Sequence, residues 1–208
     1  MSNEVKTKEK VNMDPKYIAK LAVTLLVPCV VVAGLLGFVN KLTLPNITAA
    51  NEKKTAEAIQ KVLPELEGSP VAMELTEDMT AAASGAGATV TEAYEAQAGG
   101  STIGYALKIV ASGSQGNIEM MVGVDTEGAV TGVSIVKNSE TSGIGSKVMT
   151  NQPTAKGVGV LDQFEGKTAA DAPLNVGTNV DAISGATVSS KGVTTGVNAA
   201  LAVAGVIG

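Results

Sequence analysis

The 208-residue sequence predicts an α+β protein with one membrane-spanning helix ahead of its folded body. Three observations predict this class. An uncharged apolar run lies near the N-terminus, Val- and Ile-rich runs separated by turn residues fill the middle, and a segment with helical periodicity closes the chain. The order of helix, antiparallel strands and helix is typical of α+β domains.

The apolar run covers residues 21–39, nineteen residues without a charge. At 1.5 Å per residue, a helix of this length nearly matches the roughly 30 Å hydrocarbon core of a bilayer. Three alternatives are less favoured. Buried helices of soluble domains are usually shorter and carry a polar stripe, and signal peptides have a shorter apolar region followed by a cleavage site. A lipid-modified Cys29 would need small residues where Pro28 stands.

Lysines predict the orientation of this span. The lysines before it are Lys6, Lys8, Lys10, Lys16 and Lys20, whereas Lys41 alone follows closely. The positive-inside rule places the N-terminus in the cytoplasm and the body on the extracytoplasmic face of the membrane. We therefore expect a cytoplasmic tail at residues 1–20, the span at 21–39, a stalk at 40–70 and a folded domain at 71–208.

Composition excludes several classes of function. The formal charge is −5, and all fifteen basic residues are lysines, so a nucleic-acid partner is not expected. No histidine is present, which removes the commonest general base and transition-metal ligand. One cysteine cannot form an internal disulfide or supply an iron–sulfur cluster. Any redox chemistry must therefore use a borrowed cofactor.

The body contains several predicted elements. Helical spacing predicts a helix over 48–66, capped by Thr48 or Asn51, and a second helix over 189–203 with Val193, Val197 and Leu201 on its apolar side. Residues 80–101, rich in Ala, Gly, Ser and Thr, predict a loop or weak strand. Strands are predicted at 103–111, 118–124 and 129–137, with a hairpin turn at 125–128, and a short strand is predicted at 174–176.

The tetrapeptide GATV occurs twice, at 87–90 and 185–188. Only the second copy follows Asp181 and Ser184 and precedes a predicted helix. The first amides of a helix have no internal acceptor and attract anions, so the hydroxyl of Thr187 stands beside a place suited to a phosphate. An ordinary turn capped by Ser184, Thr187 or Ser189 remains the alternative. The first copy lies in a segment of low complexity and is interpreted as filler.

Residues 181–189, DAISGATVS, resemble the D-x-x-[ST]-G-A-T-x-[ST] signature of the FMN-binding domain. This domain occurs in the G subunit of Rnf electron-transport complexes and in the C subunit of sodium-pumping NADH:quinone reductases. Residues 140–145, ETSGIG, are similar to the family's E-T-P-G-L-G loop, and residues 162–167 resemble its Q-F-x-G-K motif. Asn138 and Ser142 depart from the usual His and Pro, and residues 113–116 lack the Tyr of a frequent G-Y-x-G.

The resemblance implies that FMN is bonded to Thr187 through a phosphodiester, attached by a separate transferase that uses FAD. The other residues that the resemblance places at the cofactor are Asp181, Ser184, Gly185, Ala186, Ser189, Glu140, Thr141, Gly143 and Gly145. It assigns no catalytic residue and no metal ligand to this chain.

The function implied by the resemblance is electron relay in a membrane complex. That complex would move electrons between reduced ferredoxin and NAD⁺ and couple the reaction to Na⁺ or H⁺ translocation. This chain has no dinucleotide-binding signature, so other membrane and peripheral subunits, held with it in the lipid bilayer, would supply the terminal reactions. The alternatives are the quinone-reductase C subunit, which we expect to be longer, an extracytoplasmic flavin-binding sensory or electron-transfer module, and an anchored structural protein without cofactor.

Overall fold

The structure, a computed structural model, describes residues 14–207. Lys6, Lys8 and Lys10, on which the orientation argument partly rests, lie outside the described residues. The chain divides into two compact units, residues 1–51 and residues 52–208. The site lies in the second unit.

The first helix, α1, runs unbroken over Pro15–Val62 and contains Pro28 and Pro45. Its most apolar window of eighteen residues has a mean hydropathy of 2.6, and none of that window is buried. Within residues 14–207 this is the one helix long and apolar enough to cross a membrane. The predicted start of a separate helix at Thr48 or Asn51 is wrong, because the Thr48 hydroxyl donates to the carbonyl oxygen of Leu44 (3.0 Å) inside the continuous helix.

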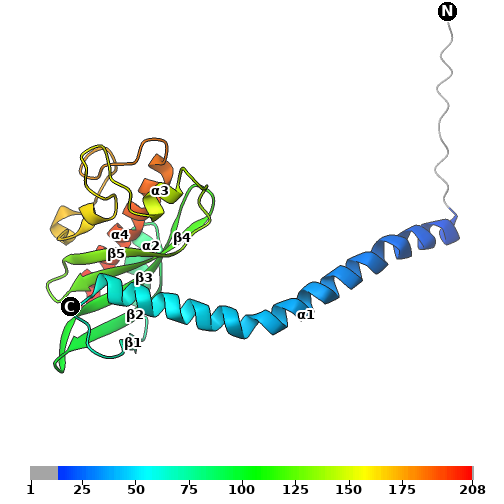
Figure 1. Ribbon diagram of the computed structural model, residues 1–208, viewed down its shortest axis with the longest axis horizontal. Coiled ribbons are helices and arrows are strands. Elements are labelled where there is room, and N and C mark those ends of the chain that lie inside the picture. The colour runs from blue at the N-terminus through cyan, green and yellow to red at the C-terminus, as the bar shows by residue number, and fades with distance from the viewer. Residues whose placement is uncertain (1–13, 208) are drawn as a thin grey trace, which may run out of the picture. The chain divides into compact units, whose positions relative to one another are not determined.

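A five-stranded antiparallel sheet forms the centre of the second unit (Figure 1). Its strands, in the order of the chain, are β1 (Val71–Met73), β2 (Thr89–Ala98), β3 (Ser101–Ser112), β4 (Asn117–Asp125) and β5 (Val130–Lys137). The last three are the three strands predicted from the Val- and Ile-rich runs. The predicted hairpin turn is present between β4 and β5, where the Asp125 carboxylate accepts from the amides of Glu127 (2.9 Å) and Ala129 (2.8 Å).

Two local predictions need correction. Residues 80–101, predicted as a loop or weak strand, contain a ten-residue strand, β2, and also most of α2 (Glu77–Gly85), a helix that was not predicted. The helix starts because Thr76 caps it, accepting from the Met79 amide at 3.2 Å, and β2 is held by pairing with β3 along its whole length. Residues 174–176 do not form a strand, since Val176 makes only an isolated bridge with Val180.

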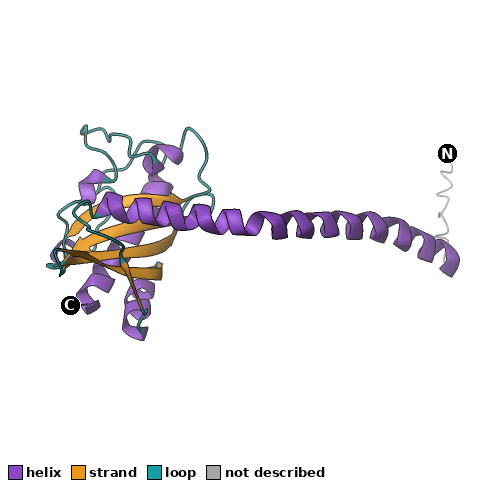
Figure 2. Ribbon diagram, turned by 60° about the horizontal axis from the view of Figure 1, so that its bottom comes forward, coloured by secondary structure: helices purple, strands orange, loops and turns teal. Residues whose placement is uncertain are grey.

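Helices cover both faces of the sheet (Figure 2). On one face, the C-terminal helix α4 (Thr187–Ile207) and α2 bury a core that includes Leu107, Met120 and Val197. On the other face, the last turns of α1 and the residues after them bury a second cluster made of Ala58, Ile59, Val62, Leu63, Leu66, Ala96, Ala106 and Met121. The arrangement confirms the α+β class.

Glycine in β4 lets α1 approach the sheet closely. A Cβ built on Gly123 would lie 2.8 Å from the carbonyl oxygen of Val62, too close for any side chain. The Thr131 hydroxyl of β5 donates to the same oxygen at 2.6 Å. This bond gives a partner to a carbonyl at the end of α1, where the last turn has none within the helix.

The segment between β5 and α4 is mostly irregular, with three short helices: α3 (Ser146–Met149), η1 (Asp162–Phe164) and η2 (Ala169–Asp171). Its motif at 162–167 fastens it to the sheet. Phe164 is 1% exposed in the core, and two backbone bonds of 2.8 Å join Val130 of β5 to Gly166 and Lys167. These bonds hold the segment at the β4–β5 end of the sheet, and from there the chain runs back to the opposite end, where α4 begins.

Candidate cofactor site

Three segments far apart in sequence meet at one end of the sheet. They are the turn between β3 and β4, the loop after β5 and the start of α4. Because neighbouring strands are antiparallel, β3 and β5 end where β4 begins. The three segments enclose a pocket of about 170 Å³, lined by Ser114, Glu140, Thr141, Ile144, Gly145, Gly185, Ala186, Thr187, Val188 and Ser189. The structure thus brings seven of the ten predicted site residues to one pocket.

The signature turn presents the start of α4 at this pocket. Gly185 has φ +82°, a left-handed conformation that favours glycine, and the Ala186 amide donates to the carbonyl oxygen of Ile183 at 2.9 Å. The helix begins at Thr187, and its first amide with a backbone acceptor is that of Ser190, bonded to Ala186 at 2.9 Å. The amides before it therefore face the pocket end as donors for an anion.

The hydroxyl groups near the start of α4 differ in their exposure to solvent and in whether they make hydrogen bonds within the protein. Ser189 and Ser190 are 2% and 1% exposed, and their hydroxyls donate to Glu140 Oε2 (2.5 Å) and to the Ala186 carbonyl (3.1 Å). Thr187 and Ser184 are exposed, and within residues 14–207 neither hydroxyl makes a hydrogen bond. Ser184, Thr187 and Ser189 cap no amide of α4 in this range, so the ordinary capped turn is not what is built.

Glu140 joins the three segments. Its Oε1 accepts from the amides of Ser114 (2.7 Å) and Gln115 (3.3 Å) in the β3–β4 turn, and its Oε2 accepts from Ser189 of α4. The Glu140 amide donates to Oδ1 of Asn138 at 3.1 Å, so the residue that replaces the usual His forms part of the local turn. Both carboxylate oxygens of this pocket-lining residue are therefore engaged by the protein itself.

Thr141 and Gly143 shape the loop through their backbones. The Thr141 carbonyl accepts from the amides of Ile144 and Ser146, each at 3.2 Å. Gly143 has φ +78°, and its amide donates to the Ser146 hydroxyl at 2.8 Å. Gly143 does not line the pocket. The loop exposes Ile144 (51%) at the pocket where Val188 (56%) is exposed, two apolar side chains that the motif comparison did not single out.

Asp181 and Ser184 also lie outside the pocket lining. The Asp181 carboxylate pairs with Lys156, with Oδ2 2.8 Å from Nζ. Its backbone is clamped by Gln163, whose Nε2 donates to the Asp181 carbonyl (2.9 Å) and whose Oε1 accepts from the Asp181 amide (2.8 Å). The second motif, at 162–167, thus holds the start of the signature turn, a link that spacing along the chain does not reveal.

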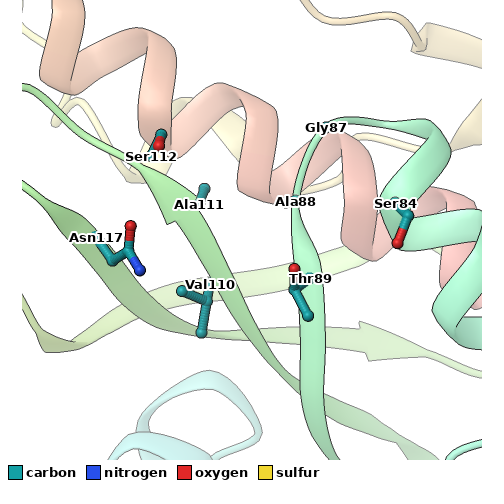
Figure 3. A pocket seen from close by; sticks show the side chains of 8 residues that line it. All are labelled: Ser84, Gly87, Ala88, Thr89, Val110, Ala111, Ser112 and Asn117. Atoms are coloured by element: carbon teal, nitrogen blue, oxygen red, sulfur yellow. The ribbon is translucent and has the colours of Figure 1, made fainter.

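The first GATV copy lies in a different place. Gly87, with φ +86°, turns the chain from α2 into β2, and Ala88 and Val90 enter the core. These residues border a separate hollow of about 350 Å³, lined by Ser84, Gly87, Ala88, Thr89, Val110, Ala111, Ser112 and Asn117 (Figure 3). No charged side chain lines this hollow, and no helix starts at the tetrapeptide. Its role in the structure is a turn between two elements.

Comparison with known proteins gives the family. Residues 113–202, from the β3–β4 turn into α4, match the family model of the FMN-binding domain. The chain is 34% identical over 220 residues to the G subunit of the Na⁺-translocating ferredoxin:NAD⁺ oxidoreductase complex of Acetobacterium woodii, with 96% of this chain and 97% of that protein covered. It is 31% identical over 192 residues to the G subunit of the ion-translocating oxidoreductase complex of Methanosarcina acetivorans, covering 90% and 95%.

A solved structure, the C subunit of the Na⁺-translocating NADH-quinone reductase from Parabacteroides distasonis, aligns with a TM-score of 0.48 at 18% identity, covering 77% of this chain and 93% of that one. The likeness to the Acetobacterium woodii protein extends through nearly the full length of both chains. The chain therefore belongs to the family of G subunits of ion-translocating oxidoreductase complexes, and its FMN-binding domain contains the pocket at the start of α4.

Proposed function

We propose that the chain is the membrane-anchored flavin subunit of an ion-translocating ferredoxin:NAD⁺ oxidoreductase complex, and that its FMN is bonded through the phosphate to the Thr187 hydroxyl. Family membership and the FMN-binding domain support the class of complex and the cofactor. When bound, FMN supplies one- and two-electron transfer that the protein's side chains lack. The chain contributes attachment, orientation and anchoring, while other subunits of the complex supply the terminal reactions.

The observation that carries the attachment site is the contrast among hydroxyl groups. Ser189 and Ser190 are buried and donate to protein acceptors, whereas the Thr187 hydroxyl is exposed at the first residue of α4. Ser184 is also exposed, but it lies outside the pocket lining, and Thr187 is part of that lining. A transferase that uses FAD can reach an exposed hydroxyl and cannot reach those two serines without opening the helix. The amides of the first helical turn are suited to the phosphate charge, and Gly185 keeps the approach open.

The exposed apolar side chains beside Thr187 fit the rest of the cofactor. Ile144 and Val188 lie on the loop and the helix that border the pocket. Exposed apolar groups at a pocket are suited to an aromatic ring system, since covering them removes apolar surface from water. Thr141 and Gly145 complete the border, and Asp181 and Gly143, outside the lining, hold the two loops through their hydrogen bonds, while Ser184 lies in the signature turn beside them.

The proposal includes a membrane anchor in α1 and a side of the membrane for the FMN-binding domain. The apolar window of α1 is fully exposed and has the length and hydropathy of a membrane span, which fits a bilayer anchor. With Lys16 and Lys20 before this window and Lys41 after it, the positive-inside rule places the FMN-binding domain on the extracytoplasmic side. A covalent bond to the flavin would prevent loss of the cofactor there.

Mass spectrometry of chain co-expressed with a flavin transferase tests the attachment. We expect an added mass of about 438 Da, the FMN residue, on the peptide that contains Thr187. Thr187→Ala should abolish the adduct. Thr141→Ala is the matched control, because Thr141 lines the same pocket, is exposed and contributes its backbone carbonyl to the loop. An adduct that persists in Thr187→Ala, or its absence from the unmodified sequence, would refute the proposal.

A further inference from the structure

We infer that Glu140 is a positioning residue, which directs the Thr187 hydroxyl outward by holding Ser189 from inside the protein. The inference rests on the proposed attachment of FMN at Thr187. It gives Glu140 a role that differs from contact with the flavin, although Glu140 lines the same pocket.

Both oxygens of the Glu140 carboxylate accept hydrogen bonds from groups of the protein. Oε1 receives two amides of the β3–β4 turn, at 2.7 and 3.3 Å, and Oε2 receives the Ser189 hydroxyl at 2.5 Å. Three donors of this kind offset the negative charge of the carboxylate. A carboxylate without them would repel the phosphate of a cofactor at the same pocket, so the hydrogen bonds make the two anions compatible.

Two glycines fix the place of the carboxylate. A Cβ on Gly145 would lie 2.8 Å from both Glu140 Cβ and Ser189 Oγ, and a Cβ on Gly113 would collide with Glu140 Oε1. Glycine at both positions leaves room for the Glu140 side chain between the loop, the turn and the helix. The close fit means that the carboxylate cannot swing toward a ligand without giving up its bonds to Ser189 and Ser114.

Helix geometry transmits this constraint to Thr187. Successive residues of an α-helix are rotated by about 100°, so residues 187 and 189 point about 200° apart. Burial agrees with this, since Ser189 is 2% exposed and Thr187 is exposed. Anchoring Ser189 on the inner side therefore orients Thr187 toward solvent, where a transferase can reach it. The amides at the start of α4, before Ser190, have no backbone acceptors. The hydrogen bond from the Ser189 side chain to Glu140 therefore has a large part in fixing this turn.

The test is a double-mutant cycle on flavin transfer to the full chain. Glu140→Gln and Ser189→Ala should each lower kcat of the transferase about tenfold with KM for the chain unchanged, since the loss of one charge-assisted hydrogen bond is of this order. The double variant should be no slower than the slower single variant, because both changes remove one interaction. In the flavin-free chain, amide hydrogen exchange should quicken in both single variants at Ser190, the first amide of α4 with a backbone acceptor, and in the helical turn after it, and should stay unchanged in β2.

Glu119→Gln is the matched control, because Glu119 pairs with Lys137 (3.0 Å) on β4 and β5, away from the pocket lining. It should leave kcat unchanged. Failure of the unmodified chain to gain FMN at Thr187 would overturn the proposed function. A normal adduct with unchanged kcat in Glu140→Gln, or a hundredfold additive loss in the double variant, would overturn the positioning role alone. If Glu140→Gln does not fold, Ser189→Ala decides, with unchanged kcat as the refuting result.

Discussion

Tyr94, Glu92 and Lys108 form a hydrogen-bonded group on the sheet face that α1 covers. The Tyr94 hydroxyl donates to Glu92 Oε2 at 2.6 Å, and Lys108 Nζ lies 2.7 Å from Oε1. Burial and the bond to Glu92 raise the pKa of Tyr94 to about 12. Burial raises the pKa of Glu92 as well, but the hydrogen bonds from Lys108 and Tyr94 outweigh it and leave that pKa below its usual value of 4.5. Each group is thus stabilised in the form that it has near neutral pH.

These shifts predict how stability changes with pH. The raised Tyr94 pKa contributes stability that is complete below pH 10 and is lost as the pH rises from about 10 to about 12, because the unfolded chain releases its proton first. The lowered Glu92 pKa contributes stability that is complete above pH 4.5 and is lost as the pH falls below it. Thermal melts of the full chain in detergent should show that Tyr94→Phe removes the alkaline loss due to this residue and reduces the acidic one, because Glu92 then keeps its bond to Lys108 but loses the one from Tyr94. Tyr105→Phe is the control, and an equal alkaline slope in wild type and Tyr94→Phe would contradict the prediction.

Single residues of the site differ in how far sequence could predict them. Thr187 could be predicted, because its signature is a contiguous run and its chemistry depends on the helix start beside it. The partners of Glu140 could not, since the amides of Ser114 and Gln115 lie 26 and 25 residues earlier in the chain. The same holds for Gln163 and Asp181, which only the folded irregular segment brings together. Local patterns predict local geometry, whereas hydrogen bonds between loops depend on the register of the sheet.

Two glycines of α4 differ in the space around them. A Cβ on Gly192 would lie 2.5 Å from the carbonyl oxygen of Ser112, so this glycine allows the helix to cross the end of β3. Gly205, near the end of the same helix, has nothing within 4 Å of a built Cβ. Alanine is the better helix former by about 0.5–1 kcal/mol, so the two positions predict opposite outcomes.

Gly192→Ala should therefore destabilise the protein by about 1–3 kcal/mol through overpacking against backbone, and it should also lower flavin attachment by displacing the helix start. Gly205→Ala should be neutral or stabilise by up to about 1 kcal/mol. Urea unfolding of the two variants under identical conditions measures both effects. Equal free energies of unfolding for the two variants would contradict the prediction, because they would mean that α4 moves away from β3 at no energetic cost.

Elements with their own apolar pattern were predicted correctly, and elements that depend on partners were not. Strands β3, β4 and β5 have Val- and Ile-rich runs, and α4 has a continuous apolar stripe. Strand β2 reads TVTEAYEAQA, in which Val90 is the only Val, Ile or Leu, so the sequence indicates no more than a weak strand, and pairing with β3 stabilises it. Helix α1 continues through Thr48 because nothing breaks it there, so a possible capping residue does not mark a helix start unless the chain before it leaves the helical conformation.

Taken as a whole, the molecule places an apolar segment and a polar site in different units of one chain. The apolar window of α1 lies before residue 52, whereas the pocket, the sheet and both hydrophobic cores lie after it. Large apolar side chains exposed along the window include Leu25, Leu26 and Leu36, at 60–66%. A continuous surface of this kind is stable in a bilayer and is an aggregation hazard in water. The fold class and the apolar helix therefore follow from the pattern of apolar residues along the chain, whereas the side of the membrane depends on a few lysines.

That dependence makes the orientation testable with the full chain. Alkaline phosphatase joined after Gly208 should be active, because it folds only when exported, and a green fluorescent protein at the same place should be dark. Phosphatase joined after Asp14, before the span, is the matched control and should be inactive. Replacing Lys16 and Lys20 by Gln while adding lysines after Lys41 should lower the C-terminal phosphatase activity, because it reverses the lysine asymmetry near the span. A fluorescent C-terminal fusion with inactive phosphatase would place the flavin domain in the cytoplasm and would overturn the orientation proposed from the lysines.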